Sequence, residues 1–243
     1  MSKIFEALEN AREMKINRKI ELPLAPVSFA TPVPAAFGLQ DEMLRLSKVL
    51  ERLLSQSKSP MVQFLGANGG EGTSTIAREF ARVSSDLIGH SVLLLDADRH
   101  RPSQDRYFRL QNRIGRLDAL KDEGFSQSLF HRIGQSRLFV SPCYNTSFST
   151  PEIFDSRFEN LCCDLRREFD MVVIDSAPLT ISPDGLAIAS KVDGVVLVVE
   201  ADKTGYETVL GIKDNIARVG GNVLGVILNK RRHHIPKSIY NRL

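Results

Sequence analysis

The sequence lacks a long apolar run and has few cysteines, and both shortages restrict what the chain can be. Its longest apolar run, Gly194-Val-Val-Leu-Val-Val199, has the length of a strand, whereas a membrane-spanning helix needs roughly 20 such residues. The N-terminus is charged from Lys3 onward and lacks the apolar stretch of a signal peptide. The three cysteines, Cys143, Cys162 and Cys163, form no spaced framework and are expected to be packing residues. These features predict a protein of the reducing cytoplasm.

The chain also lacks a large excess of either charge. It has 32 Lys and Arg against 29 Asp and Glu, a formal net charge of +3. No strong basic field is available, so nucleic acid is not an expected partner. The 243 residues fit one α/β domain with a tail, or at most two small domains.

The first 38 residues are expected to form two segments outside the main domain. Residues 1–19 predict an amphipathic helix in which Ile4, Phe5 and Leu8 share one face. Residues 20–38 are rich in proline, which breaks regular structure and predicts a semi-extended linker. The helix suits docking to a partner or folding back on its own domain, and the sequence favours neither.

Residues 39–230 show the pattern of a nucleotide-binding α/β domain, followed by a basic C-terminal tail at 231–243. A helix is expected at 39–55, and strands at 61–65, 92–95, 138–140, 171–174, 195–199 and 223–228. Near-continuous apolar strands separated by helices predict a doubly wound, mostly parallel sheet with helices on both faces, as in P-loop nucleoside triphosphatases. Right-handed crossovers then bring the strand carboxyl ends to one edge, where ligands bind.

A glycine-rich loop follows the first expected strand. Its glycines allow backbone N–H groups to turn inward and approach a phosphate, and the next helix adds its positive end. Ser74 stands where a P-loop hydroxyl ligates Mg²⁺. We therefore expect ATP or ADP with Mg²⁺ as the cofactor. The loop expected to bind it comprises Gly69, Gly70, Glu71, Gly72, Thr73, Ser74 and Thr75.

Polar residues end three of the later strands. Asp96 and Asp98 follow the second strand at i and i+2, so both can point to the same side. Two carboxylates beside a phosphate loop suit a hydrated Mg²⁺, or a group that orients or deprotonates an attacking hydroxyl. Asp175 ends another apolar strand, at the position of a Walker B carboxylate, so Ser74, Asp96 and Asp175 are the expected Mg²⁺ residues. Asn229 ends the last strand, and its amide is a candidate for reading an adenine edge.

Together these motifs resemble the bacterial tyrosine kinases (BY-kinases), which belong to the MinD/ParA class of P-loop ATPases. The resemblance covers about residues 40–243. The loop Gly69-Gly-Glu-Gly-Thr-Ser-Thr75 resembles the family's Pro-Gly-Glu-Gly-Lys-Ser-Thr, and Asp96-Ala-Asp98, followed by Arg101-Pro102, looks like its second Walker motif. The resemblance implies catalytic roles for Asp96 and Asp98 and adds Arg101 to the nucleotide-binding residues.

The resemblance also implies partners and a place of action. Family members work in exopolysaccharide or capsule biosynthesis with a polysaccharide co-polymerase, a chain-length-determinant membrane protein, so a peripheral position at the inner face of the membrane is implied. Glu42, Arg45 and Lys48 are similar to the family's Glu-x-x-Arg-x-x-Arg oligomerisation motif, which implies a homo-oligomer. At helical spacing, the same three residues equally suit an exposed charged face.

Two departures from the family pattern affect the expected activity. Thr73 occupies the place of the lysine that puts a positive charge on the β- and γ-phosphates. Losing such a preorganised group typically costs about 3–4 kcal/mol of transition-state stabilisation, roughly 10²–10³ in rate. In place of the family's C-terminal tyrosine cluster stands Arg231-Arg-His-His234, which leaves Tyr240 as the only phospho-acceptor candidate after Tyr206.

Three functions are consistent with these residues. Both departures favour a pseudokinase, a regulatory subunit that binds nucleotide or only a partner. The second is an active tyrosine autokinase whose charge is relocated to Arg99, Arg101 or Lys203, or to an arginine of a neighbouring subunit. The third is a MinD/ParA-type positioning ATPase whose tail at 231–243 acts on a membrane or on DNA.

Overall fold

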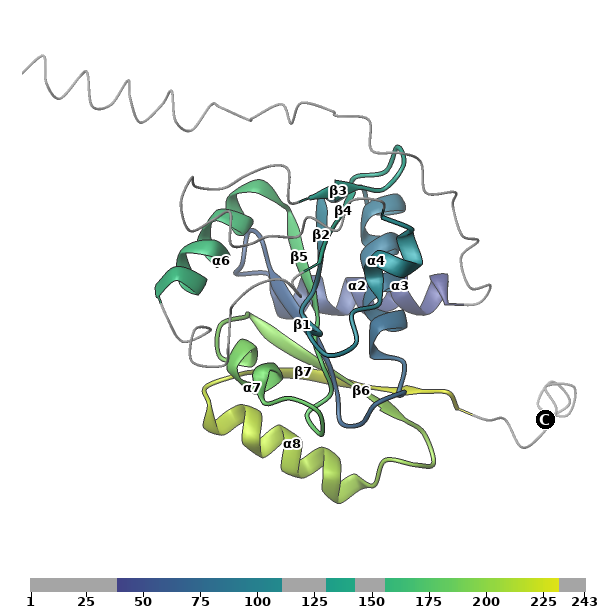
Figure 1. The fold of residues 1–243 in the computed structure, drawn as a ribbon, viewed down its shortest axis with the longest axis vertical. Coiled ribbons are helices and arrows are strands. Elements are labelled where there is room, and N and C mark those ends of the chain that lie inside the picture. The colour runs from purple at the N-terminus through teal and green to yellow at the C-terminus, as the bar shows by residue number, and fades with distance from the viewer. Residues whose placement is uncertain (1–38, 111–129, 143–155, 232–243) are drawn as a thin grey trace, which may run out of the picture.

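The computed structural model describes residues 39–110, 130–142 and 156–231 (Figure 1). The expected N-terminal helix at 1–19, the linker at 20–38, Tyr240 and all of the basic tail except Arg231 lie outside these described residues. The proposed division of the chain into these segments stays a prediction.

The centre of the fold is a seven-stranded sheet with the order β3-β4-β2-β5-β1-β6-β7 (Figure 1). Its strands are β1 (Met61–Gly66), β2 (Val92–Asp96), β3 (His131–Arg132), β4 (Leu138–Pro142), β5 (Met171–Asp175), β6 (Gly194–Glu200) and β7 (Val223–Asn229). All neighbouring strands pair in parallel except β3, which pairs antiparallel with β4. The predicted mostly parallel sheet is confirmed. The sequence does not predict β3, because a strand of 2 residues is too short to show an apolar pattern.

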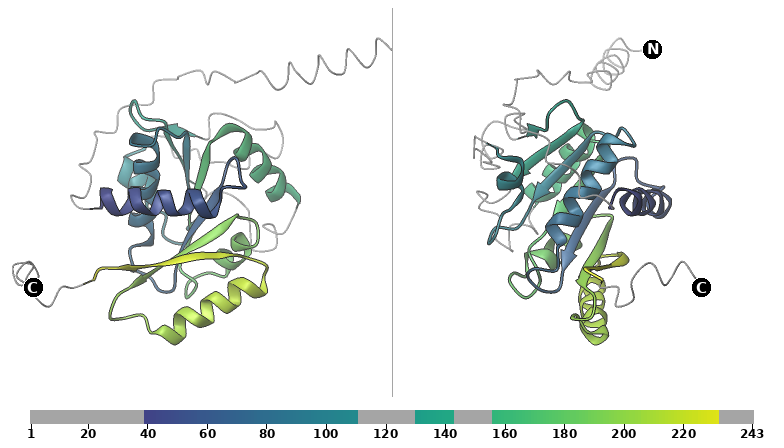
Figure 2. Two further views of the ribbon diagram at one scale, coloured as in Figure 1. Left: turned by 180° about the vertical axis from the view of Figure 1, so that it is seen from behind. Right: turned by 90° about the vertical axis from the view of Figure 1, so that its right-hand side faces the viewer.

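Helices cover both faces of this sheet (Figure 2). They are α2 (Gln40–Leu53), α3 (Thr73–Asp86), α4 (Gln104–Phe108), α6 (Ser156–Glu168), α7 (Asp184–Ala189) and α8 (Tyr206–Arg218). Successive strand residues point to opposite faces. In β2, Val92 and Leu94 belong to the cluster formed with α2 and α3, and Leu93 and Leu95 to the cluster formed with α6 and α7. The helix α8 packs with α7 on the latter face, over β6.

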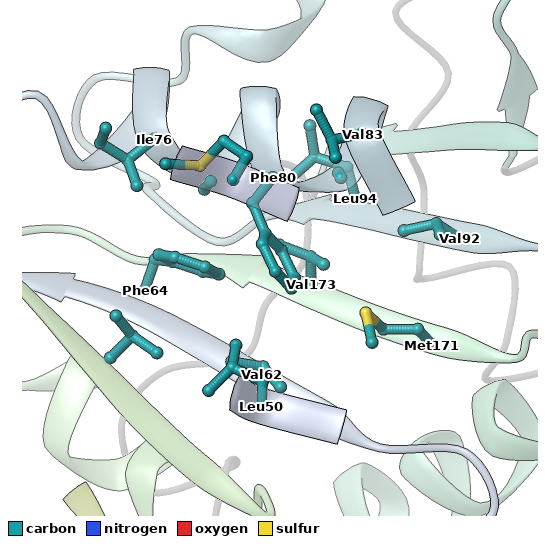
Figure 3. Packing of buried hydrophobic residues seen from close by; sticks show 14 of the residues in the cluster. Leu50, Val62, Phe64, Ile76, Phe80, Val83, Val92, Leu94, Met171 and Val173 are labelled. Carbon is teal, nitrogen blue, oxygen red and sulfur yellow. The ribbon is translucent and has the colours of Figure 1, made fainter. Parts of the chain in front are cut away.

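The core on the first face anchors the helix that follows the glycine-rich loop. Figure 3 shows Ile76, Phe80 and Val83 of α3 directed toward the strands, and the rings of Phe80 and Phe64 lie 5.3 Å apart. Both phenylalanines are fully buried, and burying a side chain of this kind stabilises the fold by about 1.5–3 kcal/mol. The start of α3 therefore has a fixed position relative to the end of β1.

The parallel strands end at a common edge of the sheet. Gly66, Asp96, Asp175 and Asn229 are the last residues of β1, β2, β5 and β7. In the strand register, Asp96 lies directly opposite Asp175. The residues selected from the sequence are therefore gathered at one edge. Within the described ranges, no helix combines the length and the apolar character needed to span a membrane.

Candidate functional site

The glycine-rich loop joins β1 to α3 and borders an open cavity of about 210 Å³. The cavity is lined by residues 68–75 together with Asp98, Arg101, Ser176, Pro178 and Ile181. Gly72 has φ +93°, and a Cβ placed on it would lie 2.2 Å from Nδ2 of Asn229. Glycine is therefore required at position 72 both by the backbone conformation and by the close approach of Asn229.

Side chains from distant parts of the chain hold the loop through its own polar groups. The buried carboxylate of Glu71 accepts hydrogen bonds from the N–H of Asn68, at 2.8 Å, and from the hydroxyl of Thr204. Asn229 Nδ2 donates to the carbonyl oxygen of Glu71 at 2.8 Å, and Lys230 Nζ donates to that of Gly70 at 2.5 Å. Asn229 thus contacts the loop and is not among the residues that line the cavity.

Thr73 is the first residue of α3 and lines the cavity. Its side chain is directed toward the end of β1, because a Cβ placed on Gly66 would lie 2.6 Å from Thr73 Oγ1. The loop itself, residues 68–75, contains no basic side chain. Its attraction for an anion therefore comes from backbone N–H groups and from the positive end of α3.

The two aspartates after β2 occupy different environments. Asp96 is fully buried, and its carboxylate accepts hydrogen bonds from the backbone N–H groups of Ser103, Gln104 and Asp98 at 2.8, 3.0 and 3.2 Å. Burial raises the pKa of Asp96 to about 6, although these three donors oppose the rise. Asp98 lines the cavity, and its Oδ1 accepts the N–H groups that follow it. Of this pair, only Asp98 is among the residues that line the cavity.

Asp175 lies behind the loop, fully buried at the end of β5. Its Oδ2 accepts a hydrogen bond of 2.7 Å from Gln104 Nε2, while its Oδ1 has no hydrogen-bond partner among the described residues. Burial, followed by the charge of Asp96, raises the pKa of Asp175 to about 7. A buried carboxylate oxygen without a partner, beside a second carboxylate and a serine, fits the oxygen chemistry of a Mg²⁺ site.

The described residues contain no group of three or more His, Cys, Asp and Glu side chains that could hold a metal ion alone. This is compatible with Mg²⁺, which takes few protein ligands and keeps several waters or phosphate oxygens. Ser74 and Asp98 would face such an ion from the cavity lining, with Asp96 and Asp175 behind them.

Three residues of this site carry no sequence signal. Gln104 is fully buried, and its Nε2 also donates to the carbonyl oxygen of Ser74 at 3.1 Å. Its Oε1 accepts a hydrogen bond of 3.2 Å from Arg78, whose guanidinium lies 3.5 Å from the centre of the Tyr107 ring. Glutamine and arginine are usually surface residues, so only the tertiary contacts reveal this buried connection to Asp175.

The oligomerisation candidates lie on α2, away from the loop. Glu42, Arg45 and Lys48 are exposed, whereas Met43 and Leu50 are buried against the core. The three charged residues therefore share the solvent side of the helix. Both an oligomerisation motif and a merely exposed charged face require this position.

Comparison with known proteins identifies relatives by sequence, although no protein-family model matches the chain. The tyrosine-protein kinase YwqD of Bacillus subtilis (strain 168) is 29% identical over 178 residues, covering 73% of this chain and 74% of YwqD. The tyrosine-protein kinase CpsD of Streptococcus pneumoniae is 28% identical over 185 residues, covering 73% and 78%. The succinoglycan biosynthesis transport protein ExoP of Rhizobium meliloti (strain 1021) is 29% identical over 184 residues, which cover 74% of this chain but only 23% of ExoP.

Solved structures show the same fold. The kinase domain of the Escherichia coli tyrosine kinase ETK superposes with a TM-score of 0.70 at 19% identity, covering 81% of this chain and 78% of that one. The septum site-determining protein MinD of Pyrococcus horikoshii OT3, complexed with Mg-ADP, gives a TM-score of 0.58 at 12% identity, with 76% of each chain covered. By sequence, the chain is similar to bacterial tyrosine-protein kinases, and its fold is similar to that of the ETK kinase domain and of MinD.

Proposed function

We propose that this chain binds ATP or ADP with Mg²⁺ and acts as a regulatory, weakly catalytic or non-catalytic BY-kinase relative in exopolysaccharide biosynthesis. The observation that carries the proposal is a cavity bordered by a complete glycine loop whose first helical residue is Thr73 instead of lysine. The loop supports binding, and the threonine argues against fast phosphoryl transfer.

Nucleotide binding is supported by the way the loop is held. Its carbonyl groups at Gly70 and Glu71 are bonded by Lys230 and Asn229, which leaves the opposite, N–H side of the loop for a ligand. The helix α3 begins at this loop and is 14 residues long, so its positive end adds to the attraction for phosphate. A bound Mg²⁺ would neutralise phosphate charge, and Ser74, Asp98 and Asp175 are the residues to hold it through direct or water-mediated contacts.

Weak catalysis is supported by the charges around the loop. Threonine offers a hydroxyl where a transferring phosphoryl group needs a cation, which costs about 3–4 kcal/mol of transition-state stabilisation. Both oxygens of Asp96 already accept backbone N–H groups, so Asp96 is poorly placed to take a proton from an attacking hydroxyl. Asp98 is the remaining carboxylate in the cavity lining and is the base candidate for any residual activity.

The polysaccharide role is supported by the names of the relatives. The chain matches two tyrosine-protein kinases along most of their length and under a quarter of ExoP, a succinoglycan biosynthesis transport protein. We infer that a chain-length-determinant membrane protein is the partner and that it holds the chain at the inner face of the membrane. Co-purification with such a membrane protein is the direct test of this partner. The same proposal includes the assembly of several copies of the chain into a ring, with contacts made by Glu42, Arg45 and Lys48.

The nucleotide proposal is tested by binding and turnover together. We expect the wild type to bind Mg-ATP and Mg-ADP by calorimetry and to hydrolyse ATP very slowly. Thr73→Lys is expected to raise turnover by roughly 10²–10³, whereas Thr73→Val, which matches threonine in shape, provides the control without a charge. Rapid ATP turnover by the wild type would refute weak catalysis. Tyrosine phosphorylation by the wild type would establish the autokinase, and Tyr240→Phe would then test its acceptor. Wild-type protein that binds no nucleotide would refute the proposal.

A further inference from the structure

Gln63 is a polar residue in the middle of the otherwise apolar strand β1. It is paired with Ile174 of β5 on one side and with Val195 of β6 on the other, and its side chain is fully buried. Its Oε1 has no hydrogen-bond partner among the described residues, and leaving a buried polar atom unpaired is unfavourable for folding. An apolar side chain would avoid this penalty. The stability of the sheet therefore does not account for an amide at position 63.

The partners of this amide fix its orientation. Nε2 of Gln63 lies 2.9 Å from the carbonyl oxygen of Gly185 and 2.8 Å from Oγ of Ser176. A backbone carbonyl group can only accept a hydrogen bond, so the NH₂ group must be the end of the amide that faces Gly185. The same nitrogen carries a second proton, which it donates to Ser176. The hydroxyl oxygen of Ser176 is therefore an acceptor in this contact.

This contact leaves the hydroxyl proton of Ser176 available to a ligand. A serine hydroxyl donates one hydrogen bond in addition to those that it accepts. Within the part of the chain that the structure describes, the only hydrogen bond of the Ser176 side chain is the one from Gln63. Ser176 is 3% exposed and lines the cavity. A hydroxyl group buried to this extent needs an acceptor for its proton, and a ligand in the cavity can supply it.

The position of Ser176 indicates which part of a nucleotide it meets. The backbone N–H groups of a P-loop cradle the α- and β-phosphates, and here that loop is residues 68–75. Ser176 belongs to the part of the cavity lining that lies outside the loop, directly after Asp175 at the end of β5. The terminal phosphate of ATP extends past the phosphates that the loop holds. This phosphate is therefore the one within reach of Ser176.

We propose that Ser176, oriented by Gln63, donates a hydrogen bond to the terminal phosphate of bound ATP, so that the site distinguishes ATP from ADP. The inference rests on the proposed nucleotide binding and adds two residues that no sequence motif identifies. ADP lacks the third phosphate and leaves the hydroxyl without this acceptor. Gln63 does not line the cavity and acts as a positioning residue. Its second hydrogen bond, to Gly185, ties the orientation of the hydroxyl to the start of α7.

The experiment measures the affinities of the full chain for Mg-ATP and for Mg-ADP by calorimetry. Ser176→Ala is expected to weaken Mg-ATP binding by about tenfold or more, because a hydrogen bond to a charged oxygen is lost. Mg-ADP binding should change by less than about twofold. Ser176→Thr keeps a hydroxyl and should keep the wild-type ratio of the two affinities. Ser190→Ala removes a hydroxyl that is bonded to Ala187 outside the cavity, so this matched control should leave both affinities unchanged.

A second variant tests the role of Gln63. Gln63→Met keeps an unbranched side chain of similar length and removes the NH₂ group, so the hydroxyl of Ser176 loses its fixed direction. Mg-ATP affinity should then fall by about 3–10-fold while Mg-ADP affinity stays within about twofold of the wild type. In a Ser176→Ala background, Gln63→Met should change the ratio of the two affinities by less than about twofold, because the two residues act as one unit.

The outcomes separate the inference from the proposed function. Unchanged Mg-ATP affinity in Ser176→Ala, or an equal loss for Mg-ATP and Mg-ADP, would overturn the inference and leave the proposed function standing. An equal effect of Gln63→Met with and without the Ser176 hydroxyl would overturn the positioning role of Gln63. If Ser176→Ala does not fold in urea-unfolding controls, the two affinities of Gln63→Met decide the same question. A wild type that binds no Mg-ATP would refute the proposed function, and the inference with it.

Discussion

The buried aspartates at the ends of β2 and β5 predict that the nucleotide-free protein loses stability as the pH rises from 5 to 8. Asp96 and Asp175 have pKa values raised to about 6 and about 7 from an ordinary 3.8, in both cases mainly by burial. At pH values between its unfolded-state and folded-state pKa, such a carboxyl group binds more protons in the folded protein than in the unfolded protein. The free energy of unfolding therefore falls as the pH rises through this window.

The size of the effect follows from the same pKa values. Once the group has ionised, each unit by which its folded-state pKa exceeds its unfolded-state pKa lowers the free energy of unfolding by about 1.4 kcal/mol. Counting only the part that develops between pH 5 and 8, the two neighbouring carboxyl groups together lower the free energy of unfolding by about 3–4 kcal/mol. Burial lowers the pKa of His131, which acts in the opposite direction because the folded state then prefers the neutral imidazole. The aspartate contribution must therefore be isolated with a variant.

The assay is urea unfolding of wild type and Asp175→Asn at pH 5, 6.5 and 8 without Mg²⁺. Asparagine has the same shape and cannot ionise, so the difference in stability between the two proteins should shift by about 2–3 kcal/mol in favour of the variant across this range. Millimolar Mg²⁺ should stabilise the wild type more at pH 8 than at pH 5, because the ion binds the ionised carboxylates. A difference between wild type and Asp175→Asn that is constant with pH would refute the assignment of Asp175 as a buried, titrating group.

Three substitutions test the remaining parts of the site and its support. Gln104→Leu should lower the free energy of unfolding in urea by about 1–3 kcal/mol, since it leaves the buried Asp175 and Arg78 without their amide partner; no loss would contradict the buried bridge. Gly72→Ala should weaken Mg-ADP binding in calorimetry, because the added Cβ would lie 2.2 Å from Asn229 Nδ2; wild-type affinity would show that the loop tolerates a side chain there. Phe80→Ala should cost about 3–5 kcal/mol of stability in the same urea assay, and a cost below that of an ordinary surface substitution would contradict the packing of Phe80 on Phe64.

The sequence predicts the framework of the fold well because its signals are local or periodic. Each buried parallel strand is a short apolar run, and the glycines of the loop mark backbone conformations that other residues avoid. The carboxyl-edge positions of Asp96, Asp175 and Asn229 follow directly from the strands that they end. The local sequence pattern is therefore enough to predict that these residues lie at one edge of the sheet.

Side-chain partners across the fold are not predicted in this way. The sequence makes Asn229 a candidate for an adenine contact, yet its amide donates to the carbonyl group of Glu71, 158 residues away along the chain. The choice between Asp96 and Asp98 as the cavity residue depends on which backbone N–H groups turn toward each carboxylate. Such choices depend on the tertiary arrangement of loops, which leaves no periodic trace in the sequence.

Under the proposed function, the charges of the site favour a Mg-nucleotide over a free nucleotide as the ligand. A lysine at position 73 would offset part of the negative charge of Asp96 and Asp175 before any ligand arrived. With Thr73 in its place, burial favours protons on these two carboxyl groups, as their raised pKa values indicate. A bound divalent cation would replace those protons and would bring positive charge to the phosphate side at the same time. Because ion and nucleotide each remove an electrostatic obstacle to the other, their binding should be strongly coupled, which suits a protein that senses nucleotide more than one that consumes it.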